Sequence, residues 1–254
     1  MAGGQHGAWR AGAIVLKQVT DVTEASWCAE VLAAVTTDSR FRVARPLAAA
    51  SGWIVAGWSA WRWLPGRSAD WRLHEIAAAG EAFHQAIRDV PRPDFIDRRD
   101  DPWSHGDRIA WEEEQLPDTG PWLPELRQLA SMRTTVSAES RLMHPDLAGN
   151  VLFEPGRPPA VIDWPPYWRP AAWAAAIAAV DGLDTGRVTL ADATGLSEGP
   201  QWAQLLVRAE LYRLGTKNHA AVHGRPLADD KVHHRRTVGW LHQLAEAAAR
   251  ERPG

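Results

Sequence analysis

The sequence of 254 residues predicts an α+β protein in two parts, a small β-rich N-terminal part and a larger, mostly helical C-terminal part. Three observations support this prediction. Runs of β-forming residues cluster before residue 64, helical periodicity prevails after it, and a strand–loop–hairpin pattern interrupts the helices at residues 141–164.

The composition, with 45% hydrophobic and 23% charged residues, is that of an ordinary globular protein. A net charge of −3 provides no basic field for a nucleic-acid backbone, so we expect no nucleic-acid partner. The single cysteine, Cys28, excludes an internal disulfide, which fits a reducing cytoplasm. No stretch resembles a signal peptide, and the longest apolar run, 171–180, is too short to span a bilayer. We expect a soluble cytoplasmic protein without a membrane partner.

The β-rich part begins with a predicted strand at residues 12–19, followed by a helix from Asp21 to about Thr36. Apolar residues recur along this helix at helical spacing, and Glu24 lies on the same stripe. Residues 41–46 and 52–58 are predicted as further strands of one small sheet.

Helical periodicity resumes after Ser68, a predicted N-cap, and continues to Ile87. His84 lies on the apolar face of this helix and is expected to be a core histidine with satisfied hydrogen bonds. Residues 92–121 have little periodicity and are typical of a solvated surface segment, although their carboxylates could meet a cationic substrate. Further helices are predicted at residues 122–132, 171–183, 200–214 and 227–250, with Gly215 as a C-terminal cap.

The stretch 141–164 carries the polar residues that most indicate chemistry. It is predicted to form a strand, a polar loop and a β-hairpin, because no helix could cross its Glu-Pro-Gly-Arg-Pro-Pro turn. His144 and Asp146 lie in the loop, Asn150 at the entry to the hairpin, and Asp163 after its second strand. Such oxygen ligands suit Mg²⁺, and Asp146 could act as a base for a hydroxyl group. The alternative is that these are solvated turn residues, since turns favour Asp, Asn, Pro and Gly.

These four residues, in this order and local structure, resemble the catalytic segment of the aminoglycoside phosphotransferase-like branch of the protein-kinase-like superfamily. The resemblance implies a protein-kinase-like two-lobed fold, with ATP and Mg²⁺ as cofactors. It also implies that Asp146 is the catalytic base, beside His144 in a His-x-Asp loop, and that Asn150 and Asp163 hold Mg²⁺ against the nucleotide phosphates. The loop from Asp146 to Asn150 is one residue shorter than is usual, a change that can shift a loop by up to about 3.5 Å. Some actinobacterial members are similar in this short loop and in a Pro-Tyr-Trp-Arg-Pro run like residues 166–170.

The resemblance extends to the β-rich part. Lys17, one of three lysines, ends the first predicted strand as the family's phosphate-contacting lysine does, and Glu24 would be its partner. The alternatives are a surface lysine and a capping box formed by Asp21 and Glu24.

Other residues in this part resemble the nucleotide-binding elements of the family. Gly4 and Gly7 resemble the loop that covers the phosphates, although a glycine cluster at this place is also typical of a frayed terminus. Trp61 and Trp63 fall in the segment that resembles the hinge between the lobes, where adenine binds. The resemblance thus implies an N-lobe at residues 1–64 that covers the nucleotide, and a C-lobe at residues 65–254 with the catalytic loop and the acceptor-binding helices.

The function implied by the resemblance is that of a small-molecule kinase, which transfers the γ-phosphoryl group of ATP to a hydroxyl of an antibiotic-like, sugar-like or nucleoside-like acceptor. The chain passes from Asp163 almost directly into the helix at 171–183, which leaves no room for a long activation segment and favours a small acceptor over a protein. One alternative is a non-catalytic nucleotide-binding or regulatory pseudokinase, which the short loop favours. A second is an interaction protein using its 15 tryptophans. The C-terminal histidines lack the local Glu or Cys partners of a zinc motif, so we expect no zinc site there.

Overall fold

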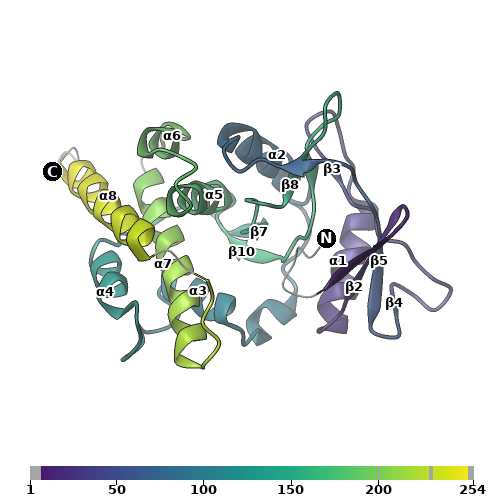
Figure 1. The fold of residues 1–254 in the computed structure, drawn as a ribbon, viewed down its shortest axis with the longest axis horizontal. Helices are drawn as coiled ribbons and strands as arrows, with labels where there is room; N and C mark the ends of the chain where they lie inside the picture. Colours follow the sequence, from purple (N-terminus) through teal and green to yellow (C-terminus); the bar gives the residue numbers. More distant parts are fainter. Residues whose placement is uncertain (1–6, 200, 229–230, 251–254) are drawn as a thin grey trace.

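The computed structural model describes residues 7–199, 201–228 and 231–250 of the chain. Figure 1 shows a small sheet packed with one helix at one end of the molecule, a helical region at the other end, and short strands between them. The strands are β1 (Ala8–Ala11), β2 (Ile14–Gln18), β3 (Arg42–Val43), β4 (Ile54–Val55), β5 (Trp58–Arg62), β6 (Arg67–Ser68), β7 (Arg141–Met143), β8 (Val151–Phe153), β9 (Ala160–Val161) and β10 (Tyr167–Arg169). The helices are α1 (Val22–Ala34), α2 (Leu73–Ala86), the 3-10 helix η1 (Asp94–Arg98), α3 (Pro102–Ala110), α4 (Leu123–Ser131), α5 (Trp173–Asp184), α6 (Leu190–Gly195), α7 (Trp202–Val222) and α8 (Lys231–Arg250). Within the described part of the chain, no helix is both long enough and apolar enough to cross a membrane.

The N-terminal sheet contains four antiparallel strands in the order β1-β2-β5-β4. Strand β1 was not predicted, because it lies at the sheet edge with three of its four residues exposed and so lacks an apolar alternation. The single strand predicted at 52–58 is instead the β4–β5 hairpin. Its turn residues Ala56 and Gly57 have φ values of 49° and 78°, as a two-residue turn with positive φ at both positions requires.

Helix α1 begins where the sequence predicts it. The side chain of Asp21 is the N-cap and accepts a hydrogen bond from the backbone N–H of Glu24 at 3.0 Å. The helix buries Cys28, Ala29 and Leu32, and Cys28 Sγ lies 4.0 Å from the backbone oxygen of Trp164. Burial raises the pKa of the Cys28 thiol, which therefore behaves as a small core residue.

A second sheet, in the order β3-β9-β8-β6, joins the two ends of the molecule. Strand β3 was expected in the N-terminal sheet, but it pairs in parallel with β9 of the predicted hairpin. Ser68 is not an N-cap, because it lies in β6 opposite Leu152 of β8, and α2 begins five residues later at Leu73. After contributing β3 to the second sheet, the chain leaves the first sheet at Arg62 and returns to the second at Arg67. The exact division of the lobes at residue 64 stays a prediction.

Close helix packing organises the C-terminal region. Helices α3 and α7 cross at Gly106 and Gly215, where a Cβ atom on Gly215 would lie 3.1 Å from the Cα of Gly106. Gly215 is therefore an interior packing position of α7 and not the predicted C-terminal cap. Helix α3 itself was missed in the sequence, although Asp101 caps it by accepting from the backbone N–H groups of Trp103 and Ser104 at 2.9 and 3.0 Å.

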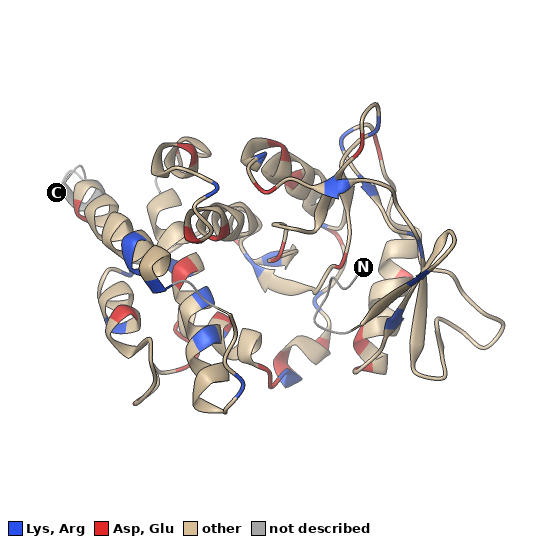
Figure 2. Ribbon diagram, in the orientation of Figure 1, with Lys and Arg blue, Asp and Glu red and all other residues tan. Residues whose placement is uncertain are grey.

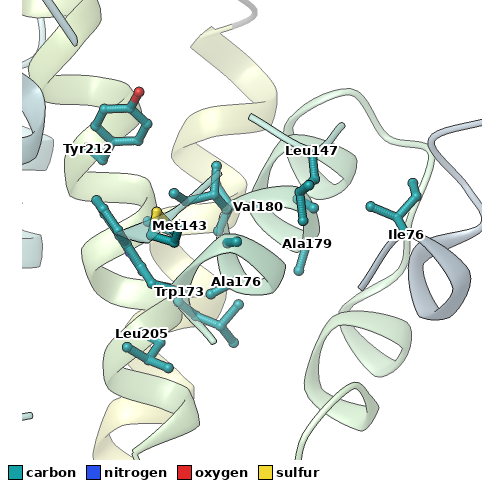
Figure 3. Packing of buried hydrophobic residues seen from close by; sticks show 14 of the residues in the cluster. Ile76, Met143, Leu147, Trp173, Ala176, Ala179, Val180, Leu205 and Tyr212 are labelled. Carbon is teal, nitrogen blue, oxygen red and sulfur yellow. The ribbon is translucent and has the colours of Figure 1, made fainter. Parts of the chain in front are cut away.

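The main hydrophobic core lies between α2, α5 and α7 and extends under the loop that follows β7. Figure 3 shows Met143 and Leu147, which flank this loop's polar residues, projecting into the core with Trp173 and Ala179 of α5. Leu147 is only 1% exposed. The segment that carries Asp146 is thus anchored to the core on the side opposite its polar groups.

Candidate active site

The loop between β7 and β8 is organised around the buried His144. Its Nδ1 accepts a hydrogen bond from the backbone N–H of Asp146 at 3.1 Å, and its Nε2 is 2.9 Å from the carbonyl oxygen of Ile162. These partners assign a neutral ring with the proton on Nε2. Burial lowers the pKa of His144, which agrees with a neutral ring. His144 therefore ties the backbone of Asp146 to the strand end that precedes Asp163, and it has no direct access to a substrate.

His84 supports this arrangement from α2. Its Nε2 accepts a hydrogen bond from the backbone N–H of His144 at 2.9 Å. Burial lowers the pKa of His84 from 6.5 to about 3, so the ring is neutral and can serve as an acceptor. The prediction of a satisfied core histidine is confirmed.

Asp146 and Asn150 lie together at the open side of the loop. The Nδ2 of Asn150 donates to the backbone oxygen of Asp146 at 2.7 Å and to its Oδ2 at 3.0 Å. The side chain of Asp146 is 44% exposed, so its carboxylate remains accessible from the cavity. The side-chain nitrogen Nδ2 of Asn150 is used within the loop. The side-chain oxygen Oδ1 is therefore the atom of Asn150 that is available to bind a cation.

Asp163 follows the hairpin with a φ of 57°, one of three described non-glycine residues with positive φ. Backbone of this kind costs free energy and concentrates at functional sites, where surrounding contacts maintain it. Its carboxylate forms an ion pair with Lys17 of β2. The two residues are 146 positions apart in the chain, so only the fold brings these two predicted site residues together.

Glu24 does not have the expected partner. Lys17 pairs with Asp163, whereas Glu24 forms two hydrogen bonds with the guanidinium of Arg99, at 2.6 and 3.1 Å. Arg99 also donates to the backbone oxygen of Pro166 at 2.7 Å. The predicted Lys17–Glu24 pair is therefore wrong for this conformation. Arg99 was missed because it lies in the irregular segment that resembled a solvated surface.

The two glycines expected to cover the phosphates lie at or before the first residue that the structure describes. Gly4 falls outside the described residues, and Gly7 is exposed immediately before β1. The next residue, Ala8, pairs with Lys17 across the sheet and lines the same cavity. A loop at Gly7 would thus lie next to the lysine.

The two hinge tryptophans have different surroundings. Trp61 lines the cavity, and its Nε1 donates to Ser59 Oγ at 3.0 Å. Trp63 packs instead against Arg10, whose guanidinium carbon lies 3.6 Å from the ring centre. Trp63 does not line the cavity, and so of the two tryptophans only Trp61 lines it; a role for either in adenine binding stays a prediction.

One cavity of about 790 Å³ connects these residues. Lys17, Asp146, Asn150 and Asp163 all contribute to its lining. Its further lining includes Val43, Ser59 and Trp61 of the β-rich part and Trp103, Tyr167 and Tyr212 of the helical part. The cavity therefore spans both parts of the molecule, with the carboxylates and the lysine between them.

The carboxylates of segment 92–121 are largely neutralised by arginines. Basic and acidic residues are interspersed over the helices (Figure 2). Arg169 binds Asp107 at 2.7 and 2.9 Å and Glu113 at 2.6 Å through two atoms each, and Arg208 binds Glu112 at 3.0 Å. Burial raises the pKa of Asp107, and the bonds from Arg169 oppose that effect. These carboxylates are structural, so they offer little free charge to a cationic substrate.

A second polar cluster lies in the core, apart from the cavity lining. Asp184 of α5, Glu210 of α7 and His234 of α8 offer ligand atoms within 4.8 Å of one another. The Nδ1 of His234 is 2.9 Å from an oxygen of each acid. Burial by itself would lower the pKa of His234, but its hydrogen bond to Glu210 and its contact with Asp184 raise that pKa from 6.5 to about 10. A proton on Nδ1 that faces both acids thus joins the three helices. The sequence could not indicate this cluster, because its carboxylates come from other helices.

Comparison with known proteins identifies a matching protein family. Residues 9–167 match the family APH, described as the phosphotransferase enzyme family. A comparison with curated proteins found no match. The structure is similar to an aminoglycoside phosphotransferase from Alicyclobacillus acidocaldarius, with 15% identity, 97% of this chain and 92% of that chain covered, and a TM-score of 0.51.

Two further structures are similar in fold. Spectinomycin phosphotransferase APH(9)-Ia, in complex with ADP and spectinomycin, has 12% identity and a TM-score of 0.54, with 98% of this chain and 92% of that chain covered. A thermostable mutant of aminoglycoside phosphotransferase APH(4)-Ia, in a ternary complex with AMP-PNP and hygromycin B, has 13% identity, the same two coverages and a TM-score of 0.52. The fold is therefore the predicted protein-kinase-like one, with a small β-rich region and a mostly helical region.

Proposed function

This chain belongs to the phosphotransferase enzyme family, and we propose that it transfers the γ-phosphoryl group of ATP to a hydroxyl of a small acceptor. One observation carries the proposal. Lys17 of the β-rich part meets Asp146, Asn150 and Asp163 of the helical part in a single cavity. Phosphoryl transfer depends mainly on positioning and on charge neutralisation, and these four side chains supply both.

The nucleotide would occupy the part of the cavity beside Lys17 and Trp61. A bound Mg²⁺ neutralises phosphate charge, and the carbonyl oxygen of Asn150 with the carboxylate of Asp163 would hold it. Lys17 would then exchange its contact with Asp163 for the phosphates. In the structure, the ion pair already holds the ammonium group of Lys17 next to the carboxylate of Asp163, so this exchange would need little movement.

The acceptor hydroxyl would approach the exposed carboxylate of Asp146, which accepts its proton. His144 is buried and acts as a positioning residue for this loop. The aromatic side chains of Trp103, Tyr167 and Tyr212 line the part of the cavity contributed by the helical region, where a small organic acceptor would pack. The similar structures bind hygromycin B or spectinomycin, which supports an antibiotic-like, sugar-like or nucleoside-like acceptor here.

The test is calorimetric titration of ATP with and without Mg²⁺, followed by measurement of phosphate release from ATP, the reaction in which water takes the place of the acceptor hydroxyl. Asp163→Ala should lose Mg²⁺-dependent binding, because it removes a metal ligand. Asp146→Asn should still bind ATP but lose turnover by about 10²- to 10⁴-fold, the usual contribution of a general base. Asp97→Ala is the matched control, since Asp97 pairs with Arg92 away from the cavity lining and should change neither result. Full turnover by Asp146→Asn would show that the assigned base is wrong.

A second candidate function is a non-catalytic nucleotide-binding or regulatory pseudokinase. The pairing of Glu24 with Arg99, which leaves Lys17 without a glutamate partner, favours it. ATP binding that is independent of Mg²⁺, with no phosphate release by the wild-type protein, would support this alternative over catalysis.

A further inference from the structure

The guanidinium of Arg213, on α7, joins the loop of Asp146 to α5. Its Nε donates to Asp181 Oδ1 at 2.7 Å, and its Nη2 donates to Asp181 Oδ2 at 2.6 Å. The same Nη2 donates to Asp146 Oδ1 at 2.9 Å. The side chains of Arg213 and Asp181 are 14% and 22% exposed, whereas that of Asp146 is 44% exposed. A mostly buried ion pair thus stands directly behind the accessible carboxylate.

This contact completes the restraint on Asp146. Its Oδ2 accepts from Asn150 Nδ2 at 3.0 Å, and its Oδ1 accepts from Arg213. A carboxylate held at both oxygens is restrained against rotation about its Cβ–Cγ bond. Each oxygen still has a second lone pair with which to accept the proton of a hydroxyl group.

The chemistry of arginine suits this task. Asp181 binds two nitrogens of the planar guanidinium and so sets its orientation, and Nη2 has a second hydrogen that reaches Asp146. A lysine at this place would be a single point charge and would not transmit the orientation of Asp181. Burial raises the pKa of Asp181, and the guanidinium of Arg213 opposes that effect.

We propose that Arg213, anchored by Asp181, is a positioning residue that orients Asp146 for proton acceptance. This inference rests on the proposed function, in which Asp146 is the base. Its importance follows from the geometry of general-base catalysis, where a misplacement of about 1 Å can cost about 10²-fold in rate. Arg213 itself does not line the cavity, so it would act on a substrate only through Asp146.

The central variant is Arg213→Gln combined with Asp181→Asn. It removes both charges together, since loss of either one alone would leave a partly buried charge unpaired and endanger folding. We expect phosphate release from ATP to fall by about 10- to 100-fold, while the Kd for ATP with Mg²⁺ stays unchanged. Arg213→Lys, which keeps the charge but loses the planar fork, should also lower kcat without changing that Kd.

The control is Arg208→Gln on the same helix. Arg208 is also buried, but it bonds to the carbonyl oxygen of Ala110 and to Glu112, away from Asp146. This variant should lower the Tm and leave kcat unchanged when assayed well below the Tm. A loss of kcat equal to that of the central variant would mean a general structural effect and would overturn the proposal.

A crystal structure of the Arg213→Gln, Asp181→Asn variant gives a readout that does not need activity. We expect the carboxylate of Asp146 to be rotated relative to its orientation in the wild-type protein, or to occupy more than one orientation. Unchanged kcat, or an unmoved Asp146, would overturn the inference. If the wild-type protein neither binds ATP with Mg²⁺ nor releases phosphate, the proposed function fails, and the orientation of Asp146 in the variant alone decides whether Arg213 positions it.

Discussion

Gly80→Ala tests how the core supports the loop of Asp146. Gly80 is buried on α2, and a Cβ atom there would lie 2.3 Å from Cδ1 of Leu147. Carbon atoms in contact are normally about 3.5–4.0 Å apart, so one group must move by more than about 1 Å. Leu147 is only 1% exposed and cannot turn into solvent. The movement should therefore reach the backbone of its neighbour Asp146.

Two effects on stability compete in this variant. Overpacking a filled core lowers the free energy of unfolding by about 1–3 kcal/mol. Replacing a helical glycine by alanine raises it by about 0.5–1 kcal/mol. Gly239→Ala on α8 is the matched control, because Gly239 is exposed and a Cβ there would meet no atom within 4 Å. Subtracting the two results removes the helix-propensity effect. The remaining difference should be about 1–3 kcal/mol, or roughly 2–12 °C in Tm for a chain of this size.

The assays are thermal unfolding and phosphate release from ATP. Gly239→Ala should raise the Tm and leave turnover unchanged. Gly80→Ala should lower the Tm and reduce kcat by up to about 10²-fold, through displacement of Asp146, with an unchanged Kd for ATP. If both variants are stabilised alike and turnover is unaffected, the core does not position the loop in the way described.

Two further predictions concern buried histidines. The pKa of His234 is raised from 6.5 to about 10, so its protonated ring stabilises the folded state. This contribution to the free energy of unfolding is complete below pH 6.5 and is lost as the pH rises towards 10. The difference in stability between wild type and His234→Gln should thus be largest at or below about pH 6.5 in urea titrations and should shrink as the pH rises towards 10; a constant difference up to pH 10 would contradict this. The pKa of His84 is lowered to about 3, so its contribution is present above pH 6.5 and lost as the pH falls below that value. His84→Leu should cost about 1–3 kcal/mol at pH 7 by leaving the N–H of His144 unpaired, and His84→Gln, which keeps an acceptor, should restore part of the loss; equal stability of the two would refute the role of that bond.

The family's central motif could be predicted because its signals are local. Proline and glycine define the turn of the hairpin, and Asp146, Asn150 and Asp163 stand at the ends of the short apolar strands around it. The structure contains each of these strands, and one cavity contains all three polar residues. Local pattern was also sufficient for α1, whose N-cap Asp21 and apolar stripe are both visible in the sequence.

Errors arose where a partner lies far away in the chain. Strand β3 pairs with β9 rather than with its sequence neighbours, and Ser68 enters a sheet instead of capping a helix. Gly215 resembles a helix end, but close contact with Gly106 makes it an interior position of α7. In each case the residue type permits two environments, and only the neighbouring element decides between them.

By itself, the sequence determined the α+β class, most of the longer helices and the residues of the segment from His144 to Asp163, since these depend on turn chemistry and on periodicity over short distances. Only the tertiary structure decided the ion-pair partners. Lys17 meets Asp163, and Arg213 reaches Asp146 from 67 positions away. The physical reason is that the long side chains of arginine and lysine can satisfy any nearby carboxylate, so their pairing is decided by how the helices and strands pack.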